Sequence, residues 1–383
     1  MIMTVDRKTI FDQARRVVIK VGSGVLTGKN GLNKERIDSL SRQISTLLAT
    51  GIEVLLVSSG AMACGQRKIG LSRRPDEIPK RQAIAAVGQA DLIWTYEVAF
   101  SLYNRKVAQI LLTGDDLSSS RRRYLNARNT LNTLLEWKVL PIINENDTVA
   151  TEEIKFGDND NLSALISLMM NADILINLTD IDALYTTDPR VNPDAEKIPV
   201  VTQINREIET LASGLPGVLG TGGMLSKIRA AKKVTSAGIP MVIANGCSET
   251  ILESLFSGEP GTGTFFSPSR EKLSNRKCWI AFHRKTKGVL RIDDGAVNAI
   301  LQKGKSLLPS GIIGVEGEFG IGAPVALHDS QEKWVATGLV NYKAADIRRI
   351  MGIRTDRIRD ELGDKPYDEV IHRNNMTVLG NNC

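Results

Sequence analysis

The sequence predicts an α/β protein in which a three-layer sandwich, built on a mostly parallel sheet, precedes a small β-rich domain. Three observations support this fold class. Apolar runs of strand length alternate with helical patterns over residues 17–244, which is typical of a parallel sheet covered by helices on both faces. Polar or glycine-rich stretches follow these runs directly, as they do at the carboxyl ends of strands in such sheets. Beyond about residue 260 the apolar runs become short and are separated by turns, which indicates a second domain rich in strands.

In the first part, each strand is predicted from an apolar run and each helix from a helical spacing of apolar residues. The runs begin with VVIKV and predict strands at residues 17–21, 107–112, 139–144, 174–180 and 240–244, and a further strand in EVLLVSSGA that leads into a turn of small residues at 58–61. The patterns between them predict helices at residues 33–50, 82–103, 124–137 and 162–170, and GTGGMLSKIRAAKKV is predicted to be a glycine turn that enters a further helix. The helix that begins at Asn33 ends at Gly51, because glycine favours the end of a helix.

The second part follows a turn-rich, charged stretch at about residues 258–276, which we interpret as a linker. Short strands are expected in CWIAFH, GVLRI, IIGVEG, PVALH and VATGLV, around one helix at residues 294–302. These elements predict a compact domain. We therefore expect domains at residues 1–265 and 277–360, and a C-terminal tail at residues 361–383.

Composition excludes several classes of protein and of site. The apolar runs are far shorter than a membrane span, and the amino terminus lacks the apolar core of a secretion signal. The four cysteines lie far apart, which argues against zinc and disulfides and fits a reduced cytoplasm (Cys64, Cys247, Cys278 and Cys383). Histidine occurs only at residues 283, 328 and 372, so histidine cannot serve catalysis in the first two thirds of the chain. The net charge of +6 fits an anionic small molecule or a nucleic acid.

Two glycine-rich turns, each with a lysine, are candidates for binding phosphate. Lys20 lies near the end of the first strand, and Gly22, Ser23 and Gly24 follow it. Glycines let the backbone approach a ligand and turn several N–H groups toward one anion, although a lysine at a strand end is often only a solvated surface residue. The second turn, GTGGMLSK, places Lys227 at the start of a helix. The helix dipole disfavours a cation there unless an anion binds; a flexible loop with a solvated lysine is the alternative.

The segment FGDNDNLSAL, at residues 156–165, concentrates polar side chains ahead of a helix. Asn and Asp side chains cap helices by accepting a backbone N–H, but one cap accounts for only one of Asp158, Asn159, Asp160 and Asn161. A calcium-binding EF-hand loop needs alternating acids, then glycine and a distant glutamate, whereas Gly157 precedes the acids here. A helix cap and a ligand-binding site remain as alternatives.

Two lysines in glycine turns, without an early histidine, suit phosphoryl transfer. This reaction needs positioning and charge neutralisation more than covalent help from the protein. A carboxylate acceptor would need no general base, because a carboxyl with a pKa of about 4.3 is already ionised at neutral pH. Lysines and Mg²⁺ would offset the repulsion between such an acceptor and a polyphosphate.

Motifs along nearly the whole chain resemble the amino acid kinase family, and within it the glutamate 5-kinases. They occur in the order VVIKVGSGVLTG, VLLVSSGAMACG, AAVGQADL, LLTGDDL, YLNARNTL, PIINENDTVAT, FGDNDNLSAL, LTDIDALYTTDPR and GTGGMLSKIRAA. The succession of NEND, GDNDNLSA and GTGGM with its lysine is specific to glutamate 5-kinases within the family. The segment at about residues 277–360, with LLPSGI, is similar to a PUA domain. The resemblance implies an amino acid kinase fold for residues 1–265.

The resemblance also implies an activity, which is ATP-dependent phosphorylation of the γ-carboxylate of L-glutamate as the first step of proline biosynthesis. It implies Mg²⁺ as cofactor, a homo-oligomer, and feedback inhibition by proline involving the loop after NEND. Catalytic roles fall to Lys20, Lys227 and Asp160, of which Asp160 would orient both lysines. Glutamate would contact Ser59, Asp147 and Asn159. The nucleotide would contact Lys20, Gly22, Ser23, Thr179, Asp180, Thr221, Gly222, Gly223, Met224, Leu225, Ser226 and Lys227.

Elementary chemistry agrees with the implied glutamate contacts. The α-ammonium of glutamate needs an anion, for which Asp147 is suited, and Asn159 offers donors and an acceptor to a zwitterion. Asn161 is then left as an ordinary helix cap. Two positions depart from some relatives: Ser23-Gly24 stands in place of Thr-Ser, and Leu225-Ser226 in place of Ser-Thr. Leu225 lacks a hydroxyl, which puts a nucleotide contact through that side chain in doubt.

Two other functions compete with this interpretation. Another kinase of the family, acting on aspartate, N-acetylglutamate, carbamate or UMP, would share the lysines and glycine turns but should lack the NEND and GDNDN pair. An RNA-binding protein would act through the PUA-like domain, but that domain has only a modest positive surplus and no evident aromatic stacking platform. We therefore expect a small-molecule partner, no nucleic acid and no membrane, in the cytoplasm; the metal ligands are not predicted.

Overall fold

The structure is a computed structural model of the 383-residue chain. It describes residues 7–28, 31–118, 121–150, 159–189, 191–213, 223–269 and 286–378. The chain divides into two compact units, residues 1–272 and 273–383. Within the described ranges, every helix is too short or too polar to cross a lipid bilayer.

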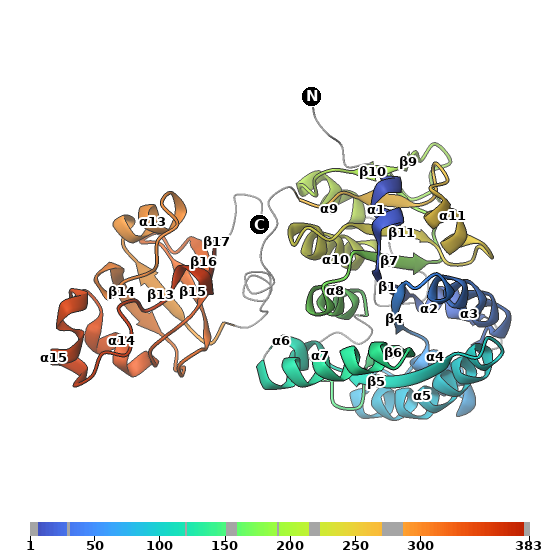
Figure 1. The fold of residues 1–383 in the computed structure, drawn as a ribbon, viewed down its shortest axis with the longest axis horizontal. Coiled ribbons are helices and arrows are strands. Elements are labelled where there is room, and N and C mark those ends of the chain that lie inside the picture. The colour runs from blue at the N-terminus through green and yellow to red at the C-terminus, as the bar shows by residue number, and fades with distance from the viewer. Residues whose placement is uncertain are drawn as a thin grey trace. The chain divides into compact units, whose positions relative to one another are not determined.

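An eight-stranded sheet forms the centre of the first unit (Figure 1). The strands lie in the order β10-β12-β11-β7-β1-β4-β6-β5. All neighbouring pairs are parallel except β11 and β12. The bounds are β1 Arg16–Val21, β4 Glu53–Ser58, β5 Lys106–Leu112, β6 Val139–Glu145, β7 Ile174–Thr179, β10 Val200–Val201, β11 Met241–Asn245 and β12 Thr264–Phe266. The prediction of a mostly parallel sheet is confirmed.

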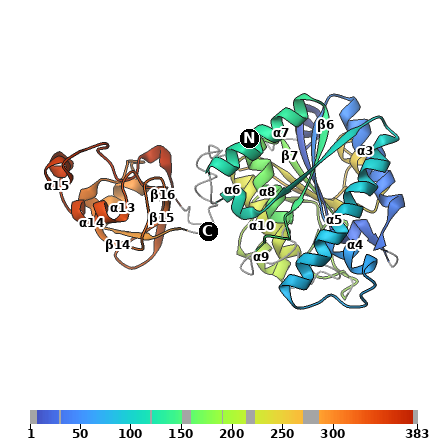
Figure 2. The same ribbon diagram turned by 90° about the horizontal axis from the view of Figure 1, so that it is seen from below.

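Helices cover both faces of this sheet, which gives the three layers seen in Figures 1 and 2. On one face, α8 contacts β1, β4, β6 and β7, and α10 packs beside α8. On the other face, α3 contacts β4, and α5 contacts β5. The helices of this unit are α1 Arg7–Gln13, α2 Ser23–Leu26, α3 Lys34–Ala49, α4 Ala61–Lys68, α5 Ile78–Ser101, α6 Gly114–Ser118, α7 Arg121–Glu136, α8 Asn159–Met170, α9 Arg206–Ser213, α10 Met224–Ser236 and α11 Ile251–Ser257.

The helix α3 illustrates how the sequence forms this layer. Asn33 caps its start, because the side chain accepts a hydrogen bond from the backbone N–H of Arg36 at 3.1 Å. Ile37, Leu40 and Ile44 are fully or almost fully buried, at the spacing that puts apolar side chains on one face of a helix. They join the core beneath the sheet.

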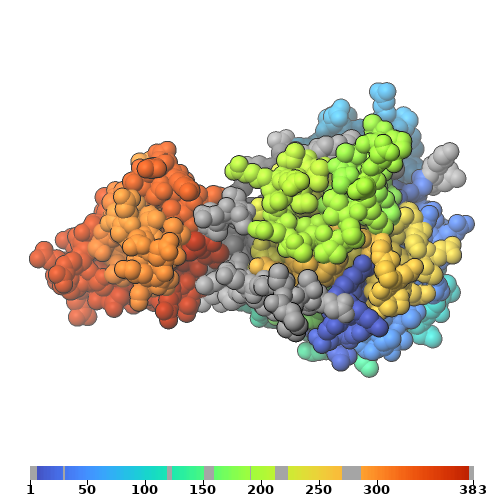
Figure 3. All heavy atoms as spheres, turned by 90° about the horizontal axis from the view of Figure 1, so that it is seen from above, coloured from blue at the N-terminus to red at the C-terminus, as the bar shows by residue number. Residues whose placement is uncertain are grey.

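The amino-terminal helix α1 packs on α11, as Figures 1 and 3 show at the surface of the first unit. Phe11 is 1% exposed, and its ring meets that of Phe256 edge to face, with centroids 5.0 Å apart. Aromatic pairs in this arrangement add about 0.5–1.5 kcal/mol to the effect of burial. This contact holds the amino-terminal helix α1 against α11.

The order in which the chain adds strands to the sheet reverses between the neighbouring strands β7 and β1. From β1 the chain continues to β4, and β6 and β5 lie beyond it, whereas from β7 it continues to β11 on the opposite side. Ligands of open α/β sheets bind beyond the carboxyl ends of the strands at such a point. Lys20 on β1 lies in register with Asn177 on β7, so these two residues mark the expected position of the ligand.

Two glycines bring α4 and α5 into backbone contact close to this edge. A Cβ on Gly88 would lie 1.9 Å from the carbonyl oxygen of Ala61 and 2.3 Å from the backbone nitrogen of Gly65. A Cβ on Gly65 would lie 1.8 Å from the carbonyl oxygen of Ile84. Because α4 begins directly after Ser59 and Gly60, this crossing fixes where the turn after β4 lies.

We expect Gly88→Ala to lower the free energy of unfolding by about 1–3 kcal/mol, because two backbones must separate to admit the methyl group. Chemical denaturation measures the change. Gly28→Ala is the matched control, since a Cβ there meets no heavy atom within 4 Å, and we expect it to stay within about 0.5 kcal/mol of the parent. Equal stability of the two variants would contradict the close helix contact.

The second unit contains a five-stranded sheet in the order β14-β13-β15-β16-β17. The pair β13–β15 is parallel and the other pairs are antiparallel. Its described elements are β13 Val289–Ile292, α13 Asp294–Leu301, β14 Ile312–Glu316, β15 Pro324–His328, β16 Trp334–Leu339, α14 Ala344–Ile350, α15 Ile358–Leu362 and β17 Met376–Val378. It has a hydrophobic core of its own, and the expected small β-rich domain is confirmed.

Several elements differ from the sequence-based expectation. The helix expected at residues 162–170 begins at Asn159. The strand β12 lies inside the stretch interpreted as a linker and belongs to the large sheet. The strand β17 lies within the segment expected as a tail and pairs with β16. The strand expected in CWIAFH falls outside the described residues, and the domain boundaries expected at residues 265, 277 and 360 stay predictions.

Candidate active site

Lys20, Asp160 and Lys227 meet at the carboxyl edge of the large sheet. The Nζ atom of Lys20 lies 2.7 Å from Oδ1 of Asp160, and the Nζ atom of Lys227 lies 3.4 Å from Oδ2 of the same carboxylate. The three residues come from the end of β1 and the first turns of α8 and α10. One carboxylate therefore bridges two lysines that are distant in sequence.

This cluster is buried, which makes its charges strongly interdependent. Asp160 is 1% exposed, and Lys20 and Lys227 are each 5% exposed. Burial alone would raise the pKa of Asp160, but the two lysine charges, with hydrogen bonds from Lys20 and Ser226, hold that pKa well below its usual range. Asp160 is therefore a carboxylate at neutral pH, and it screens the two ammonium groups from each other.

Two further groups hold the carboxylate of Asp160 in place. The hydroxyl of Ser226 donates to Oδ2 at 2.5 Å, and Nδ2 of Asn177 donates to Oδ1 at 2.9 Å. Asn177 is fully buried on β7, and its own Oδ1 has no hydrogen-bond partner among the described residues. Sequence reasoning placed Ser226 near the nucleotide but missed Asn177, whose only signal was an amide within the apolar run ILINLT.

A second polar cluster adjoins the first, because Asn159 directly precedes Asp160 on α8. Nδ2 of Asn159 donates to Oγ of Ser59 at 2.9 Å, to the carbonyl oxygen of Ser58 at 3.2 Å and to Oδ1 of Asn144 at 2.9 Å. Oδ1 of Asn159 is buried, with no partner among the described residues. The donors of Asn159 are thus engaged within the protein, and its free capacity is that of an acceptor.

Asn144 and Gln89 complete this cluster, and sequence reasoning missed both. Nδ2 of Asn144 donates to Oε1 of Gln89 at 2.7 Å, while its Oδ1 accepts from the backbone N–H of Glu145 at 2.9 Å. Asn144 is the first residue of NEND and Gln89 lies in AAVGQADL, so the motifs contained them. The chain of amides fixes the orientation of Asn159, since an Asn side chain with its donors bound cannot turn freely.

Asp147 lies in the turn that follows β6. The turn is tied to β5 by the backbone N–H of Asn146, which donates to the carbonyl oxygen of Leu112 at 3.0 Å. Burial raises the pKa of Asp147 to about 6, and the positive charges of Arg74 and Arg81 oppose that rise. Asp147 is therefore an anion at neutral pH that is easily protonated in mild acid.

The first glycine turn lies beside the loop after β7. A Cβ on Gly22 would lie 3.6 Å from Nζ of Lys20, so the turn adjoins the lysine cluster. A Cβ on Gly24 would come within 2.9 Å of Cγ of Asp180, which explains why glycine rather than serine suits this position. The hydroxyl of Thr179 donates to Oδ1 of Asp180 at 3.0 Å. Thr179 and Asp180 are thus neighbours of the turn that follows Lys20.

The second glycine turn is described only from its last glycine. Gly223 precedes α10, in which Met224 is buried and Leu225 is partly exposed. Thr221 and Gly222 lie outside the described residues. Asn161 is not the helix cap expected from the sequence: it lies inside α8, and its Oδ1 accepts from Nζ of Lys233 at 2.5 Å.

The metal-ligating side chains of the described residues also indicate how the expected Mg²⁺ would be bound. In the part of the chain that the structure describes, no three His, Cys, Asp or Glu side chains are grouped so as to hold a metal ion. Mg²⁺ in kinases is commonly held by one or two carboxylates, water and the phosphates of the substrate. Asp180, an exposed carboxylate beside the first glycine turn, fits an ion bound mainly through the nucleotide.

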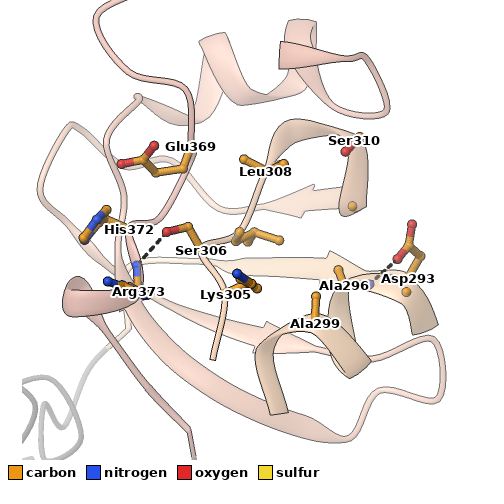
Figure 4. Close-up of a pocket in the computed structure, with 13 residues that line it drawn as sticks. Asp293, Ala296, Ala299, Lys305, Ser306, Leu308, Ser310, Glu369, His372 and Arg373 are labelled. Atoms are coloured by element: carbon orange, nitrogen blue, oxygen red, sulfur yellow. Dashed lines mark hydrogen bonds between the residues drawn. The ribbon is translucent and has the colours of Figure 1, made fainter. Parts of the chain in front are cut away.

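The second unit contains a separate pocket of about 700 Å³, shown in Figure 4. Glu369, His372 and Arg373 lie toward one end of it, Asp293 lies at the other, and Lys305 lies between them. None of the residues that line it is phenylalanine, tyrosine or tryptophan. Of the side chains on which proteins stack the bases of single-stranded RNA, its lining has His372 and Arg373.

Comparison with known proteins identifies both units. The amino acid kinase family matches residues 15–245, and the PUA domain matches residues 288–362. A protein of Syntrophus aciditrophicus (strain SB) named glutamate 5-kinase is 51% identical over 98% of this chain and 97% of its own length. One of Geobacter sulfurreducens with the same name is 50% identical over 97% of this chain and 100% of its own.

Two solved structures that match this chain are more distant from it in sequence. A carbamate kinase from Giardia lamblia bound to AMP-PNP is 16% identical, with a TM-score of 0.48 over 67% of this chain and 99% of that one. A UMP kinase from Bacillus anthracis is 17% identical, with a TM-score of 0.46 over 66% of this chain and 96% of that one. The family model matches more than half of the chain, and the relatives named glutamate 5-kinase are about half identical over nearly all of it. The chain therefore belongs to the amino acid kinase family and has a PUA domain after the kinase domain.

Proposed function

We propose that this protein transfers the γ-phosphoryl group of ATP to the γ-carboxylate of L-glutamate, giving γ-glutamyl phosphate and ADP. The observation that supports this most directly is the pair of adjoining clusters on α8. Asp160 bridges Lys20 and Lys227, while Asn159 presents a buried acceptor one residue away. The relatives named glutamate 5-kinase, about half identical over nearly the whole chain, support glutamate as the acceptor.

The lysine cluster has the chemistry that phosphoryl transfer requires. The transferring group carries negative charge on its three outer oxygens, and catalysis consists mainly of positioning and electrostatic stabilisation. Lys20 and Lys227 supply two positive charges in a buried site, and Asp160 keeps them close together before the nucleotide arrives. Mg²⁺, when bound, would neutralise further charge on the phosphates. No residue has to remove a proton, since the acceptor is already a carboxylate.

The second polar cluster, formed by Asn159, Asn144, Gln89 and Ser59, is called the amide cluster from here on. It has the chemistry that an α-ammonium group requires. Oδ1 of Asn159 and the carboxylate of Asp147 are acceptors, and an ammonium group offers only donors. The hydroxyl of Ser59 accepts from Asn159 at 2.9 Å, so its own hydrogen can be donated to a substrate oxygen. We expect Asn159→Ala and Asp147→Ala to raise the KM for glutamate more than the KM for ATP.

The direct test is ADP release from ATP in the presence of single acceptors. We expect glutamate to support turnover, and aspartate, N-acetylglutamate and UMP to give less than about one hundredth of its kcat/KM. Turnover with one of these three in place of glutamate would assign the protein to another activity of the family. Omission of the acceptor is the control for simple ATP hydrolysis.

The pH dependence of glutamate use should report on Asp147. Its pKa is raised to about 6, so the anion that binds the ammonium group is lost as the pH falls through that value. We expect kcat/KM for glutamate to fall about tenfold per pH unit below this point. The kcat/KM for ATP at saturating glutamate is the control and should lack this step. An Asp147→Asn variant that keeps the acid limb of the glutamate profile would contradict the assignment.

The wider role follows from the proposed reaction and remains part of the proposal. The product would be the first intermediate of proline biosynthesis, made in the cytoplasm by a homo-oligomer. Proline would compete with glutamate, and the loop after NEND that we expect to respond lies outside the described residues. Added proline should then raise the apparent KM for glutamate; full activity at limiting glutamate and saturating proline would exclude this regulation.

A further inference from the structure

We infer that Asn177 is a positioning residue of the phosphoryl-transfer site, whose amide holds the Asp160 carboxylate between Lys20 and Lys227 without adding a charge to this cluster. The inference rests on the proposed function, since it concerns how the two lysines act on the transferring group. It gives a role to a polar side chain that lies inside an apolar strand of the large sheet.

Asn177 lies beside Lys20, on the neighbouring strand. It is in register with Lys20 on β1 and, on its other side, with the apolar Ile243 on β11. Side chains at paired positions of neighbouring strands lie on the same face of a sheet, which here is the face covered by α8. Asn177 is fully buried, so its amide depends on groups inside the site for its hydrogen bonds.

The carboxylate of Asp160 is surrounded by four donors. Oδ1 accepts from Nζ of Lys20 at 2.7 Å and from Nδ2 of Asn177 at 2.9 Å. Oδ2 accepts from the hydroxyl of Ser226 at 2.5 Å and from Nζ of Lys227 at 3.4 Å. A carboxylate has about four lone-pair positions, so these contacts fix its plane as well as its place. Each oxygen meets one lysine and one uncharged donor, and Asn177 is the uncharged donor on the side of Lys20.

The carbonyl end of the Asn177 side chain indicates that stability alone does not account for the amide. Because Asp160 is a carboxylate, the amide nitrogen must face it and the amide oxygen must face away. That oxygen, Oδ1, is buried and has no partner among the described residues, and a buried acceptor without a partner is unfavourable. The adjacent residues of β7 are Ile176 and Leu178, and an apolar side chain at position 177 would avoid this cost. The N–H end, which meets Asp160, is therefore the functional part of the amide.

The neutrality of Asn177 matters as much as its hydrogen bond. Two ammonium groups and one carboxylate leave the cluster with one net positive charge, which stabilises negative charge on a transferring phosphoryl group. An aspartate in place of Asn177 has nearly the same shape, but its ionised form would cancel that charge. A buried carboxyl group beside another carboxylate has a raised pKa, since the two do not readily ionise together. In its protonated form the new acid would still donate to Asp160, as the amide does.

Asn177→Asp should therefore make catalysis depend on pH in a way that the parent does not. The measurement is the ratio of kcat in the variant to kcat in the parent, at saturating ATP and glutamate, so that titrations common to both proteins cancel. We expect this ratio to lie within about threefold of one at about pH 6 and to be about 10²-fold lower at about pH 9. The KM for glutamate should change by less than about threefold, since the hydrogen bond of Asn177 goes to Asp160 and not to the amide cluster.

Two further variants separate this role from general effects. Asn177→Val removes the hydrogen bond without a new charge, and valine suits a buried strand. Its urea midpoint should stay within about 0.5 M of that of the parent, while kcat falls about tenfold at every pH, the usual effect of one hydrogen bond to a charged group. Gln43→Glu is the matched control for a buried acid in place of a buried amide. Gln43 is 1% exposed on α3, which lies on the opposite face of the sheet, and glutamate there keeps the hydrogen bond from the N–H of Leu252.

The kcat ratio of Gln43→Glu to the parent should not change with pH. An Asn177→Asp ratio that is the same at every pH, or an alkaline loss that Gln43→Glu shares, would overturn the inference. So would a parent-like kcat in Asn177→Val, or a loss in that variant that only matches its unfolded fraction. A parent protein that releases no ADP with glutamate would overturn the proposed function instead. If it used another acceptor of the family, the same variants measured with that acceptor would still decide the role of Asn177.

Discussion

Lys227→Ala and Lys20→Ala should each lower kcat by about 10²–10³-fold, the loss that commonly follows removal of a charge acting on the transition state. Both lysines are buried against Asp160, so water cannot readily replace the missing charge. The KM for glutamate should change by less than about threefold, because neither lysine belongs to the amide cluster that would hold the amino acid. Steady-state kinetics at varied glutamate and saturating ATP would measure both quantities.

Lys232→Ala is the matched control for this experiment. Lys232 lies on the same helix, α10, but its Nζ pairs with Glu209 at 2.9 Å. Its removal should leave kcat within about twofold of the parent value, because no reacting group lies near it. A parent-like kcat in Lys20→Ala and Lys227→Ala would refute the assignment of the phosphoryl site, and a large loss in Lys232→Ala would show that the effect is not specific to it.

Asp160→Asn should lower both kcat and stability, for one reason. The substitution leaves Lys20 and Lys227 as two buried ammonium groups without the carboxylate that bridges them. Breaking a buried pair by removing one partner costs about 3–5 kcal/mol, and kcat should fall about 10²-fold or more because the lysines move apart. Chemical denaturation and steady-state kinetics would measure the two effects on the same preparation.

The difference in the free energy of unfolding between the parent and Asp160→Asn should depend on pH with a definite sign. The pKa of Asp160 in the folded protein is held well below its ordinary value of 3.8. The carboxylate therefore stabilises the fold fully above that value, and its contribution is lost only as the pH falls toward the lower pKa of the folded state. The difference between parent and variant should be constant from neutral pH down to about pH 5.

Asp182→Asn provides the comparison for stability. Asp182 pairs with Lys197 at 3.2 Å, with both side chains substantially exposed to solvent. An exposed pair contributes about 0–1 kcal/mol, so this variant should unfold much like the parent. If Asp160→Asn were no less stable than Asp182→Asn, the bridged cluster would not be the buried, interdependent unit that the distances indicate.

Much of the fold could be predicted because its strands are buried on both faces. VVIKV and ILINLT are nearly continuous apolar runs, and the structure has β1 and β7 at these places. Two-residue β10 and three-residue β12 could not be found in this way, since a run of that length has no periodicity. The glycines and prolines around β12 also favour a turn, and only pairing with β11 and β10 makes that segment a strand.

The candidate site was predictable where charge and glycine coincide, and less so where buried amides act on one another. Lys20 and Lys227 were conspicuous because each adjoins a glycine turn. The start of α8 at Asn159 was missed, because consecutive Asn and Asp residues resemble a capped loop. The pairing of Asp160 with Lys20 and Lys227 was implied only by the family resemblance, and that of Asn159 with Asn144 was not predicted; these partners come from other strands and helices. Local sequence contains no information on such long-range pairing.

The adjacency of Asn159 and Asp160 has a consequence for substrate length. The acceptor would be held at its amino end by one residue and would meet the phosphoryl group beside the next, and both belong to the first turn of a single rigid helix. The separation of the two ends is then set by one peptide unit rather than by loops that can adjust. The start of α8 would therefore determine the length of the acceptor that can react. An amino acid one methylene shorter or longer than glutamate would bind, but its carboxylate would lie out of line with the transferring phosphorus.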